Sequence, residues 1–218
     1  MTNPLKHNYF VRRASCVVAL GAVLSCGGKK PDQNVAPKPT APLPTAGLAG
    51  QRVALTPLTL VAAEDTLHWD AMIADRRTTL DKCDSIIATL LTARAPEVTW
   101  VGPVELRHVA HRAIPIATEP DQMGTAFLRA QNIVVVPDPL RSQLRTLLGL
   151  VGGRYALVPA GLVFRASGRP AVVRAELAVV MIDSRIGRIG WRTIATGEGE
   201  DAWTSLTRAV KSLTPGLP

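Results

Sequence analysis

The feature that most constrains this chain is a short apolar run that ends near a cysteine. Residues 14–24 are apolar or small, and Cys26 follows them after Ser25. Three basic residues precede the run, and no acidic residue does. A basic start, a short apolar segment and small residues at its end are typical of a secretory signal peptide. The run is too short for a transmembrane helix, which needs about 20 apolar residues. We therefore expect residues 1–25 to be removed and the fold to form from later residues.

The residues Val23-Leu24-Ser25-Cys26 resemble the lipobox of bacterial lipoproteins. The resemblance implies cleavage between Ser25 and Cys26, a diacylglycerol group on the sulfur and an acyl group on the new amine. Gly27 rather than aspartate follows, which in the familiar sorting rule favours an outer-membrane lipoprotein that faces the periplasm over an inner-membrane one. The alternatives are an ordinary signal peptide or an uncleaved anchor that contains a cysteine. Arg12-Arg13 is also a feature of twin-arginine export signals, but the residues after this pair match such a signal poorly.

Removal of the predicted signal peptide lowers the net charge of the chain. The 218 residues carry a net charge of +8, and the chain after Ser25 carries 22 basic against 17 acidic residues, which gives +5. The basic residues are scattered, whereas proteins that bind nucleic acid typically carry a clustered basic face. We therefore expect no nucleic-acid partner.

Cysteine usage predicts a chain without disulfides. Cys16 leaves with the signal peptide and Cys26 is acylated, so Cys83 remains as a single thiol that has no intrachain partner. Apolar residues recur around Cys83 at helical spacing, so we expect it to be buried like a small hydrophobic residue rather than to act as a nucleophile.

Residues 26–50 have the composition of a tether. Five prolines recur among Lys, Thr, Ala and Gly, and few residues in this segment could build a core. Such a composition predicts an extended, semi-rigid and disordered linker that holds a domain away from a membrane. We expect one folded domain after it, over residues 51–218.

The apolar pattern of residues 51–218 predicts an α+β domain. The expected strands cover 52–58, 98–101, 155–164, 171–182 and 188–195, and the expected helices cover 76–93, 103–113, 121–130, 140–151 and 201–213. Turn residues separate the last three strands and predict an antiparallel three-stranded meander. We expect a mixed sheet with the helices packed on one face.

Two residues of the last hairpin have predicted structural roles. Gly187 ends a four-residue turn, a position that often needs a positive φ. Alternation along the next strand places Trp191 on one face with Ile189 and Thr193. We expect Trp191 to pack against the final helix, near Trp203 or Leu206.

Three short segments of the folded region match a recurring pattern. They are the opening residues 52–58, the run 153–158 and the spacing Asp183-x-x-x-Gly187-x-x-x-Trp191. Together they resemble the TolB amino-terminal domain and the curli-secretion lipoprotein CsgG, over roughly residues 51–213. The resemblance implies their fold. The chain lacks the TolB propeller and the long membrane-inserting hairpins of a secretion pore, so the resemblance does not carry their function across.

His108 and His111 are the first candidates for chemistry. They stand three residues apart on one side of a predicted helix, a spacing that metal ligands can use. A zinc site needs further ligands, which His68 and Glu105 supply only if the fold brings them close. The residues between the histidines are Val-Ala, without the glutamate of a metalloprotease. We expect two solvent-facing histidines, with no metal and no other cofactor.

The sequence carries no catalytic motif that would name an enzyme. It contains neither Gly-x-Ser-x-Gly nor a phosphate-binding loop. Glu198, Glu200 and Asp201 precede a predicted helix, where acidic residues complement the helix dipole. The leading hypothesis is a non-enzymatic binding or assembly module, held to the lipid bilayer by acylated Cys26 and acting on envelope proteins. The alternatives are a metal-binding protein or enzyme that uses His108 and His111, and a subunit of an export channel.

Overall fold

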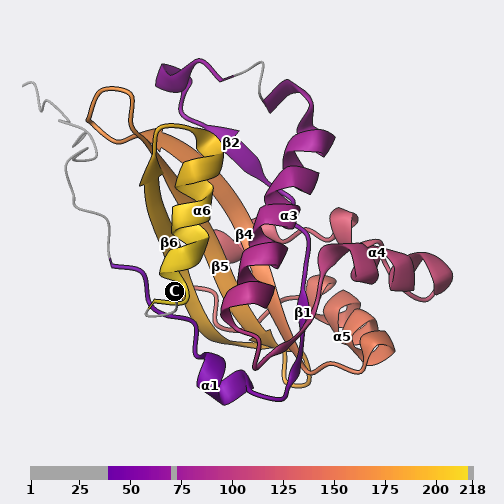
Figure 1. The fold of residues 1–218 in the computed structure, drawn as a ribbon. Coiled ribbons are helices and arrows are strands. Elements are labelled where there is room, and N and C mark those ends of the chain that lie inside the picture. Colours follow the sequence, from indigo (N-terminus) through magenta and orange to yellow (C-terminus); the bar gives the residue numbers. More distant parts are fainter. Residues whose placement is uncertain (1–38, 70–72, 216–218) are drawn as a thin grey trace, which may run out of the picture. The chain divides into compact units, whose positions relative to one another are not determined.

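The structure, a computed structural model, describes residues 39–69 and 73–215 (Figure 1). The predicted signal peptide, the cleavage site at Ser25 and Cys26, and the first part of the tether lie outside these residues. The described residues form an α+β domain, which confirms the predicted class. Its helices are α1 (Thr45–Leu48), α3 (Arg76–Arg94), α4 (Pro103–Arg112), α5 (Leu140–Val151) and α6 (Ala202–Ser212), with short 3-10 turns η1 (Asp65–Leu67), η2 (Pro120–Gln122) and η3 (Ala126–Arg129).

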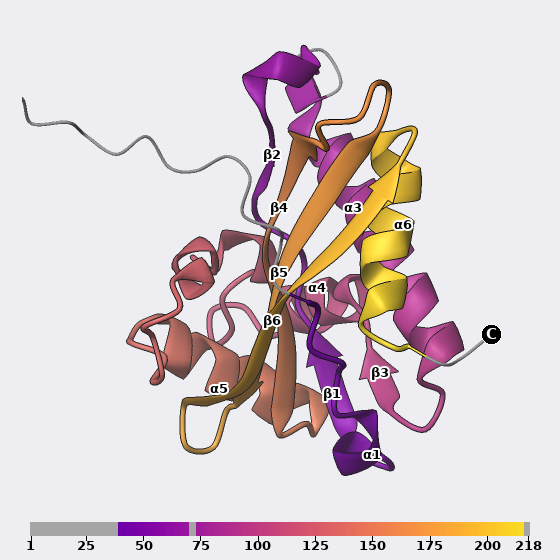
Figure 2. The same cartoon turned by 90° about the vertical axis from the view of Figure 1, so that its left-hand side faces the viewer.

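The strands form one mixed sheet of six strands in the order β3-β1-β4-β5-β6, with β2 beside β4. They are β1 (Arg52–Leu55), β2 (Val61–Ala63), β3 (Thr99–Val101), β4 (Tyr155–Ala166), β5 (Val173–Asp183) and β6 (Arg188–Gly199). β1 runs parallel to both β3 and β4, and β2 runs parallel to β4. β4, β5 and β6 form the predicted antiparallel meander, whose long strands are seen in Figure 2.

The helices cover both faces of the sheet rather than one. α3 and α6 pack on one face, and α4 and α5 pack on the other (Figure 1). β1 shows why, because Val53 and Leu55 enter the first core while Ala54 enters the second. A strand that is buried on both faces carries a continuous apolar run, as residues 53–55 do, and the prediction of one covered face overlooked this signal.

The domain begins earlier than the sequence indicated. We expected the disordered tether to reach residue 50, but residues 39–48, which we call the strap, are ordered: residues 40–43 contact β6 and the end of α6, and α1 follows. Ala41 N donates to Thr193 Oγ1 at 2.9 Å, and Leu43 N donates to Leu213 O at 2.8 Å. Leu43 is buried in the core of α3 and α6. Its two leucines, Leu43 and Leu48, thus supply apolar burial that its exposed prolines lack, and the strap covers part of an open sheet edge.

The predicted helix over residues 121–130 is wrong. The chain there forms η2 and η3, two separate 3-10 turns. Gly124 lies between them, and a glycine inside a helix destabilises that helix by about 1 kcal/mol relative to alanine. The two buried apolar side chains, Met123 and Leu128, are five residues apart, a spacing that does not follow one helical face. β2 was not predicted either, because three residues carry no measurable alternation.

A β-bulge in the last hairpin changes the predicted alternation. Trp191 pairs with Met181, whereas Ile189 pairs with Ile182, so Gly190 is the extra residue on β6. Ile189 therefore packs in the core of α4 and α5, and Trp191 packs against the core of α3 and α6 on the opposite face. The predicted shared face of Trp191 and Ile189 is wrong because one inserted residue reverses the alternation.

Candidate functional site

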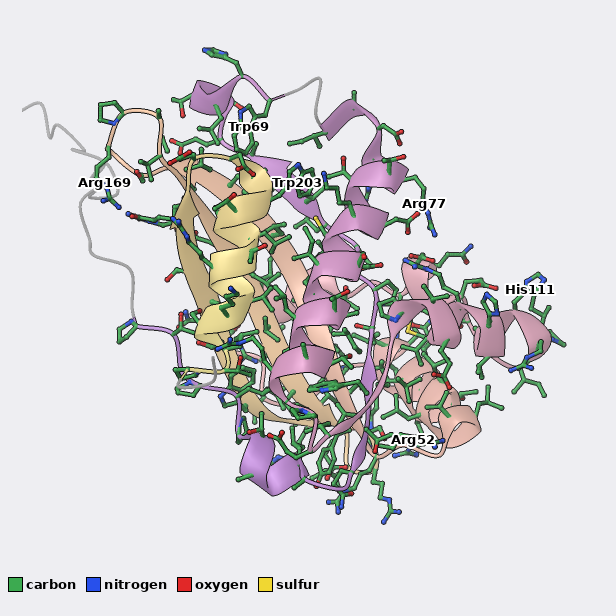
Figure 3. The ribbon with its side chains drawn as sticks, viewed as in Figure 1. Arg52, Trp69, Arg77, His111, Arg169 and Trp203 are labelled. Carbon is green, nitrogen blue, oxygen red and sulfur yellow. The ribbon has the colours of Figure 1, made fainter. Side chains whose placement is uncertain are left out.

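The predicted histidine pair lies on the rim of an open groove of about 970 Å³ beside α4. Both histidines are exposed, and His111 projects from the outer end of α4 in Figure 3. His111 Nδ1 is 3.7 Å from Glu119 Oε1. Over residues 39–69 and 73–215, no group of three His, Cys, Asp or Glu side chains is placed to hold a metal, so His68 and Glu105 do not complete a site. That the chain needs no metal stays a prediction.

Arg107 and Asp121 line this groove and form an ion cluster with the buried Asp84 behind them. Arg107 Nη2 is 2.7 Å from Asp84 Oδ2, and Arg107 Nε donates to Asp121 Oδ2 at 2.8 Å. Asp84 is only 4% exposed and also accepts a hydrogen bond from Leu58 N at 2.8 Å. Burial raises the pKa of Asp84 to about 6, although Leu58 N and Arg107 oppose the rise. Burial also raises the pKa of Asp121, but the hydrogen bonds and charge of Arg107 outweigh it and lower that pKa overall.

The groove is lined mostly by charged residues and histidines. Its lining residues come from α3, α4, η2 and the loops beside them and include no serine, threonine or cysteine. Of the three arginines that line it, Arg107 is already paired with the carboxylates of Asp84 and Asp121. Cys83 is fully buried, as predicted, and burial, followed by the charge of Asp84, raises the pKa of its thiol to about 12. Because the thiolate is the nucleophilic form, Cys83 is inert at neutral pH.

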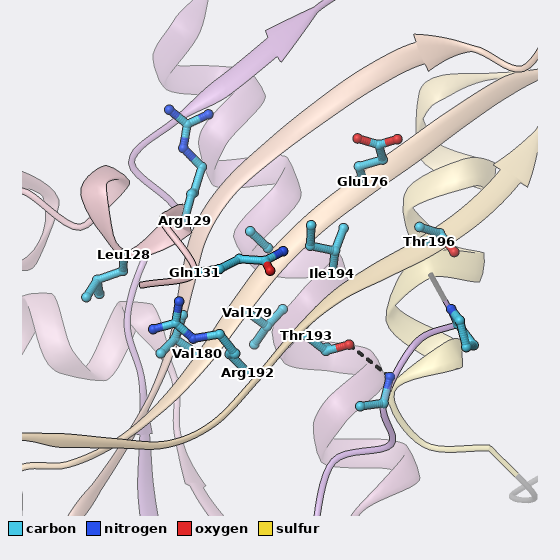
Figure 4. Close-up of a pocket in the computed structure, with 13 residues that line it drawn as sticks. Leu128, Arg129, Gln131, Glu176, Val179, Val180, Arg192, Thr193, Ile194 and Thr196 are labelled. Carbon is cyan, nitrogen blue, oxygen red and sulfur yellow. Dashed lines mark hydrogen bonds between the residues drawn. The ribbon is translucent and has the colours of Figure 1, made fainter. Parts of the chain in front are cut away.

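A second hollow lies over β5 and β6 and was not predicted. We call it the sheet pocket; it encloses about 360 Å³ (Figure 4). The loop that includes η3 bounds it on one side and the strap bounds it on the other. Its lining residues are Pro39, Ala41, Leu128, Arg129, Gln131, Glu176, Ala178, Val179, Val180, Arg192, Thr193, Ile194 and Thr196.

The floor of the sheet pocket is apolar and its rim is charged. Ala178 of β5 and Ile194 of β6 lie on its floor, and Ile194 stays exposed. Glu176 is neutralised by Arg165, whose Nε is 2.9 Å from its Oε2. The guanidinium of Arg192 donates to the carbonyl oxygens of Ala130 and Ile133, which fixes the loop beside the pocket.

Positive charge therefore prevails at the sheet pocket. Arg129 Nε donates to Ala126 O at 3.0 Å, and no carboxylate within the described ranges pairs with Arg129. Its side chain also crosses Gly161, where a Cβ would lie 2.8 Å from Arg129 Cδ, so a larger residue there would shift the Arg129 side chain. The pocket brings together the strap, the η3 loop and two strands. No local spacing in the sequence connects these four segments, so sequence reasoning missed it.

None of the helices described, over residues 39–69 and 73–215, has the length and apolar character to span a bilayer. No known family matches the chain, and no curated protein matches it either. Among solved structures, the chain is similar to the LpoB C-terminal domain from Salmonella enterica, with 14% identity over 70% of this chain and 84% of that one and a TM-score of 0.35.

Two further solved structures are similar at the same level. The PelC dodecamer from Paraburkholderia phytofirmans has 14% identity over 84% of this chain and 98% of that one, with a TM-score of 0.39. The lipoprotein GNA1162 from Neisseria meningitidis has 12% identity over 68% of this chain and 83% of that one, with a TM-score of 0.36. Likeness this distant assigns neither a family nor a function. The resemblance to TolB and CsgG stays a prediction.

Proposed function

We propose that this chain is a bacterial envelope lipoprotein that acts as a non-enzymatic binding or assembly module. Acylated Cys26 anchors it in the outer membrane, and the domain faces the periplasm. The signal-like run that ends at Cys26 and the proline-rich segment after it support the anchor and the tether. The strap supports the arrangement further, because it fixes the domain end of the tether to β6 through Ala41 and to the end of α6 through Leu43.

The observation that carries the binding role is the sheet pocket, which opens where the tether reaches the domain. Its apolar floor and its two arginines fit a segment of a partner protein that presents an aliphatic or aromatic side chain next to a carboxylate. Apolar side chains that fill pockets contribute most of the binding energy in protein interfaces. A carboxylate that pairs with an arginine adds directional, charge-assisted hydrogen bonds. Arg129 is placed to receive it, because among the described residues a carbonyl oxygen, and no carboxylate, accepts from its guanidinium.

Site-specific crosslinking in cells tests this role. A photoreactive residue replaces Ile194 at the pocket floor, and the matched control replaces Ile116, an exposed isoleucine outside the pocket. We expect one envelope protein to crosslink from position 194 only, through a peptide that contains an apolar residue beside Asp or Glu. Arg129→Glu should reduce this crosslink about tenfold, the effect of losing about 1.4 kcal/mol of binding free energy.

Two outcomes contradict the proposed pocket. One is the same set of crosslinks from positions 194 and 116. The other is a crosslink from position 194 that Arg129→Glu leaves unchanged. The rival hypothesis, a metal-binding protein that uses the exposed His108 and His111, gains support if the purified protein holds stoichiometric zinc that His111→Ala removes.

A further inference from the structure

The turn between β5 and β6 meets a second segment of the chain at one end of the sheet. Residues 134–136 pair with the start of β6, since Ile189 N donates to Val134 O at 2.9 Å and Val135 forms a bridge with Arg188. We call this end the basic tip and define it by Val134, Val135, Arg185, Ile186 and Arg188. α5 lies directly behind it (Figure 2).

Aliphatic side chains are unusually exposed at the basic tip. Val134 and Val135 are each 51% exposed, and Ile186 is 54% exposed. Exposed aliphatic residues that gather at one place, with a polar rim, mark an interaction site. Val134 and Val135 are neighbours on an extended segment and point to opposite sides of it. The three side chains therefore project from an edge and do not line a hollow.

Arginines surround these aliphatic side chains. Arg185 and Arg188 lie in the tip itself, and Arg141 and Arg145 approach it from α5. Arg145 Nη2 donates to Arg185 O at 2.9 Å. In the described part of the chain, no side chain or backbone oxygen pairs with the guanidinium of Arg141, Arg185 or Arg188.

The acidic residues near the basic tip do not cancel this charge. Asp138 caps the start of α5, accepting from Ser142 N at 3.1 Å, and it is a single carboxylate beside four arginines. Asp183 is neutralised by Arg154, whose Nη2 is 2.5 Å from Asp183 Oδ2. The local charge is therefore positive.

The basic tip is held in a fixed shape. Gly187 adopts the predicted positive φ of 65°, and a Cβ at this position would collide with the Arg141 side chain. Asp183 Oδ1 accepts from Arg185 N at 3.0 Å and so closes the turn. A preformed tip loses little conformational entropy when it binds.

We propose that the basic tip rests on the anionic phospholipid surface of the membrane that holds Cys26. This inference rests on the proposed lipoprotein function. A projecting apolar edge ringed by arginines suits a bilayer interface, where aliphatic groups enter the acyl boundary and cations meet lipid phosphates. A protein partner would have to supply a matching hollow for each of three diverging side chains.

The lengths of chain allow this contact. The strap begins at Pro39, close to Ile194 on β6. From Ile194 to Arg188 the strand spans about 20 Å, at about 3.3 Å per residue. The proline-rich chain from Cys26 to Pro39 would reach about 40 Å, at about 3.1 Å per residue. The tip and the acylated cysteine can therefore meet one membrane plane.

The test places a fluorophore at the tip of the lipidated protein. Ile186→Cys is labelled with a nitrobenzoxadiazole dye and reconstituted into phosphatidylcholine vesicles with or without phosphatidylglycerol. Cys83 is fully buried and does not compete for the dye. The matched control is Val104→Cys, at an exposed position on α4.

We expect a blue-shifted emission, protected from aqueous quenchers, only at position 186 and only with phosphatidylglycerol. The shift should disappear between 0.1 and 1 M salt, where the screening length falls from about 10 to about 3 Å. Arg185→Ser and Arg188→Ser should each weaken the contact about fivefold. Both side chains are exposed, so the fold should persist.

The outcomes separate this inference from the proposed function. Protein that washes off the vesicles contradicts the lipid anchor itself. Protein that stays on the vesicles, with the same emission at positions 186 and 104, overturns the membrane contact alone. A shift at position 186 that requires an acidic envelope protein rather than phosphatidylglycerol also overturns it.

Discussion

Arg107 on α4 and Asp84 on α3 form a 2.7 Å ion pair between helices that lie on opposite faces of the sheet. Arg107→Ala should leave Asp84 buried without its counter-charge and lower the free energy of unfolding by about 3 kcal/mol. Chemical denaturation measures this loss. Arg112→Ala, at the exposed end of the same helix, is the control and should change stability by less than about 0.5 kcal/mol.

The same pair predicts a pH dependence of stability. Burial raises the pKa of Asp84 in the folded state to about 6, above the unfolded value of about 3.9. Between these values the folded state binds more protons than the unfolded state, so Asp84 favours folding at about pH 4, and this contribution is lost as the pH rises through 6. Asp121 and Asp183 have lowered pKa values and titrate below this window.

Urea unfolding at several pH values between 4 and 7 measures this contribution. The free energy of unfolding should fall with rising pH more steeply in the wild type than in Asp84→Asn, by at most about 1.4 kcal/mol per pH unit. Parallel curves for the two proteins would show that Asp84 keeps an ordinary pKa.

A third prediction concerns stability at Gly197, the residue at which α6 crosses β6. A Cβ on Gly197 would lie 2.5 Å from Ser205 O, and the other nearest atoms are also helix backbone. Gly197→Ala should therefore displace α6 and lower the melting temperature, at a cost of about 1–3 kcal/mol. Gly190→Ala on the same strand meets no atom within 4 Å and should melt like the wild type. Equal melting of the two variants would contradict this packing.

We predict that the Trp191 side chain stabilises the fold. It is half-buried against the core of α3 and α6, so Trp191→Ala should cost about 3 kcal/mol, near the lower end for a tryptophan truncation. His111→Ala removes an exposed side chain and should leave the melting temperature nearly unchanged. If Trp191→Ala instead melts like the wild type and loses only partner binding, the residue belongs to an interaction surface.

The parts of the fold that sequence predicted are those with strong local signals. α3, α5 and α6 follow from apolar spacing, and the meander follows from its turn residues, including Gly187 with its positive φ. The missed features depend on contacts between distant segments. The strap is held by hydrogen bonds to β6 and to the end of α6, and the bulge at Gly190 has no periodic signal of its own.

The candidate sites were less predictable for the same reason. His108 and His111 stood out because they are close in sequence, yet both are exposed. Arg107, Asp84 and Asp121 meet across three separate elements, and the burial that shifts the pKa of Asp84 exists only in the fold. Arg129 and Ile194 are 65 positions apart and line one pocket.

Metabolic labelling with palmitate tests the central claim, that Cys26 anchors the protein to a membrane. The wild type, Cys26→Ala and Cys16→Ala are labelled in cells, and the third is the control because Cys16 belongs to the predicted signal peptide. The account predicts label on the wild type and on Cys16→Ala, no label on Cys26→Ala, and release of Cys26→Ala from the membrane fraction. Equal labelling of all three proteins would contradict it.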